Sequence, residues 1–188
     1  MKLVGLSGSL REASFNTALL RAAARVAPAD VEFVVETVRG IPLYDADVEA
    51  AEGVPQRVSE LKDLIAEAGG LILATPEYNN AMPGVFKNAL DWLSRPPEDS
   101  RRVFGGKPVA VIGATPGGFG TVLAQGSWLP VLRTLGTAPW FGGRLMVAHA
   151  GKVFDGDGNL EAGGTVEEQL RAFVAGFAKA AAQAASAP

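Results

Sequence analysis

The sequence contains no cysteine among its 188 residues, which excludes disulfide bonds, thiolate metal ligands and thiol nucleophiles. It contains one histidine, His149, with no obvious metal-binding partner, so we expect no metal site. An excess of basic residues is also missing, because the formal net charge is −3. That balance argues against a nucleic-acid-binding protein.

Long apolar runs are absent as well. No segment approaches the roughly 18 consecutive apolar residues that a membrane span requires. The apolar stretch after Lys2 is too short for a signal peptide. We therefore expect a cytoplasmic protein that does not associate with membranes.

The composition that remains is that of an ordinary globular protein. Hydrophobic residues make up 48% of the chain and charged residues 20%. The length suits one domain, and no linker divides the chain. We expect residues 1–188 to form a single domain.

Short apolar segments alternate with helical patterns along the chain. We expect strands at 2–6, 31–38, 71–75, 108–114 and 145–148. Helices are expected at about 14–26, 55–68, 85–93, 121–135 and 165–185, with irregular connections at 41–52 and 96–107. Five such units predict an α/β fold, a flavodoxin-like three-layer sandwich with a five-stranded parallel sheet of order 2-1-3-4-5.

Ligands of such sheets bind outside the carboxyl ends of the strands, at the point where the strand order reverses. In the predicted order this point lies among the loops that follow the first, third and fourth strands. These three loops have the most unusual sequences in the chain. We therefore place the binding site there.

The loop after the first strand combines hydroxyl groups, an amide, an arginine and the start of a helix. Backbone N–H groups at a helix N-terminus attract a phosphate dianion, and an arginine adds a planar, permanently charged donor. The loop is neither a Walker A motif nor a G-x-G-x-x-G fingerprint, and its hydroxyls fit one phosphate better than a pyrophosphate. The expected phosphate ligands are Ser9, Arg11, Ser14, Asn16 and Thr17. A polar turn in which Ser14 or Asn16 only caps the helix is the alternative.

The other two loops suit a flat ring. The loop after the third strand begins at Pro76 and carries Tyr78, an aromatic plate that can pack beside a ring. Asn79 can bond to the heteroatoms of such a ring. In the loop after the fourth strand, Gly117 and Gly118 let the backbone approach a flat ligand closely. Either loop alone is compatible with ordinary packing, but the three together describe a shelf with a phosphate at one end and a ring at the other.

Three segments carry a family resemblance. In order along the chain, residues 7–16 (SGSLRxxSxN), 76–79 (PEYN) and 83–92 (PGVxKNALDW) resemble motifs of the NADPH-dependent FMN reductase family. That family includes quinone reductases, chromate reductases and some azoreductases. Two positions depart from its pattern: Ala81 stands where a serine is frequent, and Leu123 where an arginine is frequent. Both departures concern the subunit interface or the acceptor pocket, and neither concerns the phosphate loop.

The resemblance implies specific ligands for FMN. It implies that the phosphate is held by Ser9, Arg11, Ser14, Asn16 and Thr17. It implies that the isoalloxazine ring is lined by Pro76, Glu77, Tyr78 and Asn79. It implies that the ring site is closed by Thr115, Gly117 and Gly118. It further implies a homodimer or homotetramer, with the helix carrying residues 87–92 near the subunit contacts.

The expected activity is a two-step exchange. NADPH or NADH gives a hydride to bound FMN, and a quinone, an azo compound, free flavin or a metal oxyanion such as chromate then takes the electrons. Because the cofactor carries this chemistry, we expect no catalytic side chain. One alternative is a flavodoxin-type electron carrier without nicotinamide oxidation of its own. Another is a nucleotide-binding module without flavin.

The roles of several side chains stay open from sequence alone. Glu77 suits either the edge of the ring or an ion pair between subunits. Arg101 and Arg102 suit a solvated basic turn better than the extra phosphate of NADPH. Trp128 and Trp140 suit either the core or the wall of an acceptor pocket.

Overall fold

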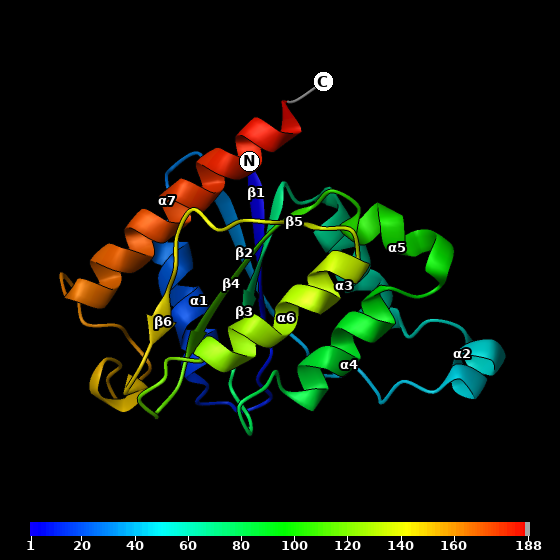
Figure 1. The fold of residues 1–188 in the computed structure, drawn as a ribbon, viewed down its shortest axis with the longest axis horizontal. Helices are drawn as coiled ribbons and strands as arrows, with labels where there is room; N and C mark the ends of the chain where they lie inside the picture. Colours follow the sequence, from blue (N-terminus) through cyan, green and yellow to red (C-terminus); the bar gives the residue numbers. More distant parts are fainter. Residues whose placement is uncertain (187–188) are drawn as a thin grey trace.

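A computed structural model describes residues 1–186 and shows a parallel sheet between two layers of helices (Figure 1). The strands are β1 (Lys2–Ser7), β2 (Glu32–Thr37), β3 (Gly70–Ala74), β4 (Pro108–Ala114), β5 (Ala138–Pro139) and β6 (Met146–Val147). Their order is β2-β1-β3-β4-β5, with β6 also paired to β4, and every pairing is parallel. The predicted flavodoxin-like α/β fold and its strand order are confirmed.

Seven α-helices lie within the described residues. They are α1 (Phe15–Val26), α2 (Ala46–Glu52), α3 (Gln56–Glu67), α4 (Gly84–Leu93), α5 (Pro97–Phe104), α6 (Val122–Thr134) and α7 (Thr165–Ala185). A short 3₁₀ turn, Ala150–Lys152, follows β6. All five helices expected from the sequence are present, with ends that differ by a few residues at most.

Two helices lie where the sequence predicted irregular connections, so those two predictions are wrong. In the first connection Asp45 caps α2, its side chain accepting a hydrogen bond from the backbone N–H two residues on. In the second connection Pro97 occupies the first turn of α5, where the missing N–H costs nothing. Two acidic residues in that first turn and two arginines in the last turn complement the helix dipole. These signals favour a helix, but the prolines in both segments led to the prediction of irregular structure.

The fifth strand position is divided in two. The strand expected at 145–148 exists as β6, which pairs with Gly113 and Ala114 at the carboxyl end of β4. The start of β4 pairs instead with β5, whose Pro139 has no N–H to extend the ladder. Between β5 and β6 the chain passes through Gly142 and Gly143, which have no side chains to hold a strand together.

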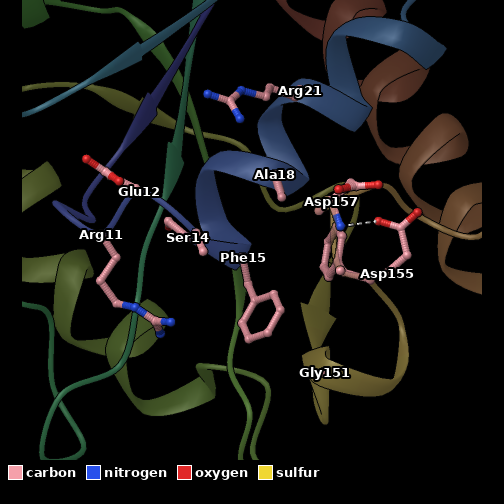
Figure 2. A pocket seen from close by; sticks show the side chains of 13 residues that line it. Arg11, Glu12, Ser14, Phe15, Ala18, Arg21, Gly151, Asp155 and Asp157 are labelled. Atoms are coloured by element: carbon pink, nitrogen blue, oxygen red, sulfur yellow. Dashed lines mark hydrogen bonds between the residues drawn. The ribbon is translucent and has the colours of Figure 1, made fainter.

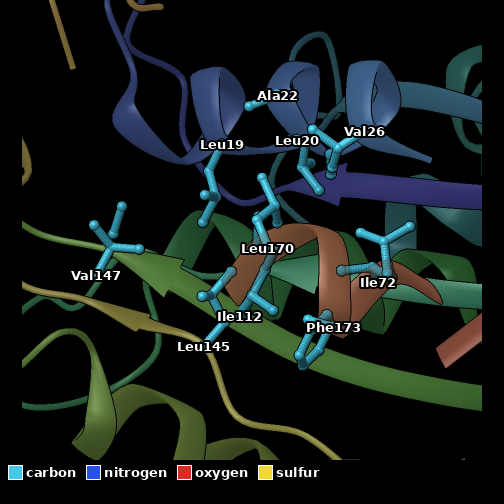
Figure 3. Packing of buried hydrophobic residues seen from close by; sticks show 14 of the residues in the cluster. Leu19, Leu20, Ala22, Val26, Ile72, Ile112, Leu145, Val147, Leu170 and Phe173 are labelled. Atoms are coloured by element: carbon cyan, nitrogen blue, oxygen red, sulfur yellow. The ribbon is translucent and has the colours of Figure 1, made fainter. Parts of the chain in front are cut away.

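The two faces of the sheet bury separate apolar clusters. On one face, α1 and α7 pack on the sheet, with Leu19, Leu20 and Leu170 among the buried side chains (Figure 3). On the other face α3, α4, α5 and α6 cover the sheet, and both Trp92 and Trp128 are fully buried there. Burial on both faces fixes the strands, so the loops at their carboxyl ends start from rigid positions. Among the described residues, no helix combines the length and apolar character that a bilayer-spanning segment requires.

An ionic cluster joins α5 to α3. Lys62 is 4% exposed, and its ammonium contacts the carboxylate of Asp99 at 2.5 Å. Arg102 bonds to Asp99 and, at 2.9 Å, to Asp63. The hydrogen bond from Arg102, followed by that from Lys62, holds the pKa of Asp99 well below its usual range. Arg102 therefore has a structural role on the helical layer.

Candidate functional site

The three loops singled out from the sequence meet at the carboxyl ends of β1, β3 and β4. They enclose a pocket of about 210 Å³, which we call the three-loop pocket. Eight of the twelve predicted site residues line it: Ser9, Arg11, Ser14 and Asn16 from the first loop, Pro76, Glu77 and Tyr78 from the second, and Thr115 from the third. Four do not line it: Thr17, Asn79, Gly117 and Gly118.

The first loop is shaped by hydroxyl groups. Ser14 is the N-cap of α1, and its Oγ accepts a hydrogen bond from the N–H of Thr17 at 3.2 Å. The hydroxyl of Thr17 pairs with that of Ser7 at 2.8 Å, so it is buried beneath the pocket. Ser9 accepts a bond from the N–H of Arg11 at 3.3 Å. The capping role predicted as an alternative for Ser14 is therefore present, and its hydroxyl hydrogen remains available to a ligand.

Asn16 connects the first loop to the third. Its side-chain nitrogen donates to the carbonyl of Ala114, and its side-chain oxygen accepts from the N–H of Ala114, both at 2.9 Å. Asn16 is only 4% exposed. One N–H of the amide is left for a ligand. The residue type of Asn16 predicted a phosphate ligand, but no local pattern predicts this clamp, which joins residues 98 positions apart.

A glycine sets the depth of the same loop. Gly8 donates its N–H to the carbonyl of Ala74 at 3.0 Å, which holds the loop against the end of β3. A Cβ at this position would lie 2.0 Å from the ring of Phe86, far inside contact distance. Only glycine lets the loop pass over α4 at this depth.

The donors of the first loop suit a phosphate monoester. Arg11 is exposed, and within residues 1–186 its guanidinium has no ion pair or hydrogen-bond acceptor. The first turn of α1 contains no acidic residue, so no negative side chain opposes the helix dipole, and the N–H groups that Ser14 does not cap remain free. A dianion placed between this helix end and Arg11 gains from both.

The second loop is a tight hairpin. Tyr78 and Ala81 exchange two backbone hydrogen bonds, of 3.0 and 3.1 Å. Asn79 and Asn80 both have positive φ angles, +50° and +62°, as a type I′ turn demands. The turn leaves Tyr78 48% exposed beside the three-loop pocket. Its ring is therefore free to contact a flat ligand.

Glu77 has a partner that neither sequence alternative named. Its Oε2 accepts hydrogen bonds from the backbone N–H groups of Leu123 and Ala124, both at 2.9 Å. The N-cap residue of α6, Thr121, has a φ of +67° and makes no side-chain capping bond. The carboxylate of Glu77 therefore caps α6 from another loop and ties the hairpin to that helix.

The third loop lies against the only histidine. The Oγ1 of Thr115 accepts from the N–H of Gly117 at 3.4 Å, and the carbonyl of Gly117 accepts from the N–H of His149 at 3.0 Å. A Cβ on Gly118 would lie 3.7 Å from the His149 ring. Gly117 and Gly118 are exposed and follow Pro116, which lines the pocket, but they do not line it themselves.

The tryptophans left open by the sequence have structural contacts. Trp128 is fully buried under the site, and its indole N–H donates to the hydroxyl of Thr75 at 3.0 Å. Trp140 packs edge-on against Phe173 of α7, with ring centroids 5.1 Å apart. Neither Trp128 nor Trp140 lines the three-loop pocket.

Comparison with known proteins gives a consistent set of relatives. The family model described as NADPH-dependent FMN reductase matches residues 1–152. The chain is 41% identical over 175 residues to an NAD(P)H-dependent FMN reductase of Pseudomonas aeruginosa, covering 92% of each chain. It is 39% identical over 177 residues to a 2-hydroxy-1,4-benzoquinone reductase of a Burkholderia species, covering 94% of this chain and 92% of the relative.

A solved structure agrees with these matches. FerB, a flavoenzyme NAD(P)H:(acceptor) oxidoreductase from Paracoccus denitrificans, superposes with a TM-score of 0.84 at 31% identity. The alignment covers 97% of both chains.

Proposed function

The chain belongs to the NADPH-dependent FMN reductase family, and on this premise we propose that it is an NAD(P)H-dependent oxidoreductase that reduces quinones through bound FMN. The observation that carries this proposal is the three-loop pocket. It gathers the Arg11 guanidinium, which is unpaired within residues 1–186, hydroxyl donors and a helix N-terminus without acidic residues next to an exposed tyrosine ring.

The first loop is suited to the phosphate of FMN. Arg11 would neutralise part of the phosphate charge, and Ser9 and Ser14 would donate from the pocket wall. We assign Thr17 a supporting role, because its hydroxyl already pairs with Ser7. Asn16 positions the site chiefly through its two bonds to the third loop.

The second and third loops are suited to the ring of FMN. Pro76 and Tyr78 would line it, with Asn79 at the turn beside it and Glu77 holding that turn against α6. Thr115, Gly117 and Gly118 would close it from the third loop, where backbone without side chains permits close approach. When bound, FMN would supply the redox chemistry of this site, hydride uptake from NAD(P)H and two-electron reduction of the acceptor. The side chains of this chain then bind and orient, and none needs to act as acid or base.

We propose that azo compounds, free flavin and metal oxyanions such as chromate also serve as acceptors, since the exposed Tyr78 leaves the ring side open. We further propose one FMN-binding domain over residues 1–188, a cytoplasmic location, and a homodimer or homotetramer. The exposed side chains of Tyr78, Phe119 and Leu123 around the site are consistent with a partner subunit.

Two spectra test the proposal against its rivals. The protein as purified should show the visible absorbance of oxidised flavin, and anaerobic NADPH should bleach it without a partner reductase. A coloured protein that neither NADPH nor NADH bleaches would be a flavodoxin-type electron carrier. A protein that neither contains nor takes up FMN would be a nucleotide-binding module of another kind.

Replacement of one arginine tests the phosphate assignment. Arg11→Ala should raise the Kd for FMN about 10-fold to 100-fold, because hydrogen bonds to a charged group contribute roughly 1.5–3 kcal/mol. Arg25→Ala, on the exposed side of the same helix, is the control and should leave the Kd unchanged. Equal FMN affinity of the Arg11→Ala variant and the wild type in a fluorescence titration would refute the phosphate loop.

A further inference from the structure

A second cavity adjoins the three-loop pocket. It has a volume of about 360 Å³ and lies between the first two turns of α1 and the loop 151–158, which lie side by side in Figure 2. Arg11, Ser14 and Phe15 line both cavities, so the two are separated by little more than these side chains. We call the second cavity the Arg21 pocket, after the arginine at its outer end. Of the residues that line it, the proposed FMN site uses only Arg11 and Ser14.

The walls of the Arg21 pocket are partly aromatic and partly without side chains. The rings of Phe15 and Phe154 stack with centroids 5.7 Å apart and planes at 28°. Ala18 faces Gly158, where a Cβ would lie 3.5 Å from the Ala18 methyl. Gly151 also lines the cavity. Small residues on both sides let the loop approach α1 closely, and the stacked rings give the cavity an apolar wall.

One wall is preformed by its own hydrogen bonds. Asp155 Oδ1 accepts from the N–H groups of Asp157 at 3.0 Å and Asn159 at 2.7 Å. An antiparallel bridge between Phe154 and Leu160 closes the loop behind them. The backbone hydrogen bond from Asn159 is the main cause that lowers the pKa of Asp155. This carboxylate is therefore committed to the loop, and the loop needs no ordering when a ligand binds.

Other charges in the Arg21 pocket are uncommitted. Arg21 is exposed at its edge, and in the part of the chain that the structure describes its guanidinium has no ion pair or hydrogen-bond acceptor. The carboxylates of Asp157 and Glu12, which also line the cavity, likewise have no side-chain partner there. Arginine is the residue that accommodates a ribose phosphate, and a carboxylate suits ribose hydroxyls. An apolar wall, a free guanidinium and a free carboxylate together match a nucleotide.

The position of the Arg21 pocket indicates which nucleotide it binds. The proposed reaction needs the nicotinamide of the reductant to reach the ring bound in the three-loop pocket, so the rest of the dinucleotide must lie nearby. We propose that the Arg21 pocket binds the adenosine end of NADPH, with Arg21 contacting the 2′-phosphate. This inference rests on the proposed function, and it adds a preference for NADPH over NADH.

A fragment without nicotinamide tests the pocket independently of electron transfer. On the FMN-loaded protein, 2′,5′-ADP should bind in a calorimetric titration, and Arg21→Ala should raise its Kd at least 10-fold. Arg21→Glu should weaken binding further, because it places a like charge beside the phosphate. The affinity of 5′-AMP, which lacks the 2′-phosphate, should change less than twofold in either variant. Arg25→Ala is the matched control from the same helix, outside the cavity.

Kinetics separate this inference from the proposed function. Arg21→Ala should raise the KM for NADPH at least 10-fold with an unchanged kcat, while the KM for NADH stays within twofold. Failure of both NADPH and NADH to bleach the flavin of the wild type would refute the reductase, and the titration with 2′,5′-ADP would still test the pocket. Equal Kd values of 2′,5′-ADP for the wild type and Arg21→Ala, or no binding to the wild type, would refute the pocket assignment.

Discussion

Removal of the Glu77 carboxylate should both destabilise the fold and weaken FMN binding. Glu77 accepts two hydrogen bonds of 2.9 Å from the start of α6, a helix whose own N-cap residue makes no side-chain bond. Loss of an N-cap acceptor costs about 0.5–2 kcal/mol, and loss of a charge near a helix N-terminus about 0.3–1 kcal/mol. Because Glu77 is half-buried, we expect about 1.5 kcal/mol for Glu77→Ala.

That free energy converts to a measurable shift in melting temperature. For a chain of this length, 1 kcal/mol corresponds to about 2–4 °C, so Glu77→Ala should lower the Tm by about 3–6 °C. Glu77→Gln keeps an acceptor oxygen but loses the charge, and it should lower the Tm by roughly half as much. Glu161→Ala is the control, since this exposed carboxylate makes no side-chain hydrogen bond in the described residues. Circular dichroism of the FMN-free protein gives the Tm of each variant.

The second readout is FMN affinity. Since Glu77 holds the hairpin of Tyr78 and Asn79 against α6, its loss should misplace the wall proposed for the ring. Glu77→Ala should therefore raise the Kd for FMN more than Glu77→Gln does. A Tm within 1 °C of the wild type would show that the carboxylate does not cap α6. A lowered Tm with an unchanged FMN Kd would support the capping of α6 by Glu77 and refute its role in positioning the ring wall.

Other positions give shorter tests of the same structure. Asn16→Ala leaves a buried N–H and carbonyl of β4 without partners and should cost about 2–5 kcal/mol, measured by urea unfolding; a loss under 0.5 kcal/mol would contradict the clamp. Gly8→Ala places a methyl against the buried ring of Phe86 and should cost about 1–3 kcal/mol by the same assay. A second substitution, Phe86→Leu, should recover part of this stability in the double variant. The pKa of Asp99 is depressed in the folded state by Arg102, so its contribution to stability is complete above pH about 4 and is lost as the pH falls below that value. Tm measured between pH 4 and 2 should therefore fall less steeply for Asp99→Asn than for the wild type, and parallel curves would refute the assignment.

Local sequence signals were sufficient for the framework of this fold. Strands such as β4 (Pro108–Ala114) are short apolar runs that alternate with amphipathic helices, and this order alone predicts a doubly covered parallel sheet. The switch-point rule then located the three loops that surround the pocket. Two helices inside the framework were missed: α2, which begins after its cap Asp45, and α5, where Pro97 stands at a helix start rather than in a loop.

The roles of individual site residues depended on contacts that no local pattern contains. Asn16 meets Ala114 across 98 positions, and Glu77 meets Ala124 across 47. Both side chains have the right chemistry for a ligand, so their residue types pointed to FMN. Only the folded chain shows that backbone groups of a neighbouring loop already occupy much of their bonding capacity. The divided fifth strand is a similar case, since the pairing partner of Met146 is set by the path of the preceding loop.

The bond between Asn16 and Ala114 also fixes when this protein can acquire its cofactor during synthesis. A ribosome releases the segment around Asn16 early, but the segment that holds its amide emerges only after β4 has been translated. Until then a nascent chain carries the residues proposed to bind the phosphate without the anchor that orients Asn16. We therefore expect FMN capture to be a late step of biogenesis, and fragments that end before β4 to remain colourless.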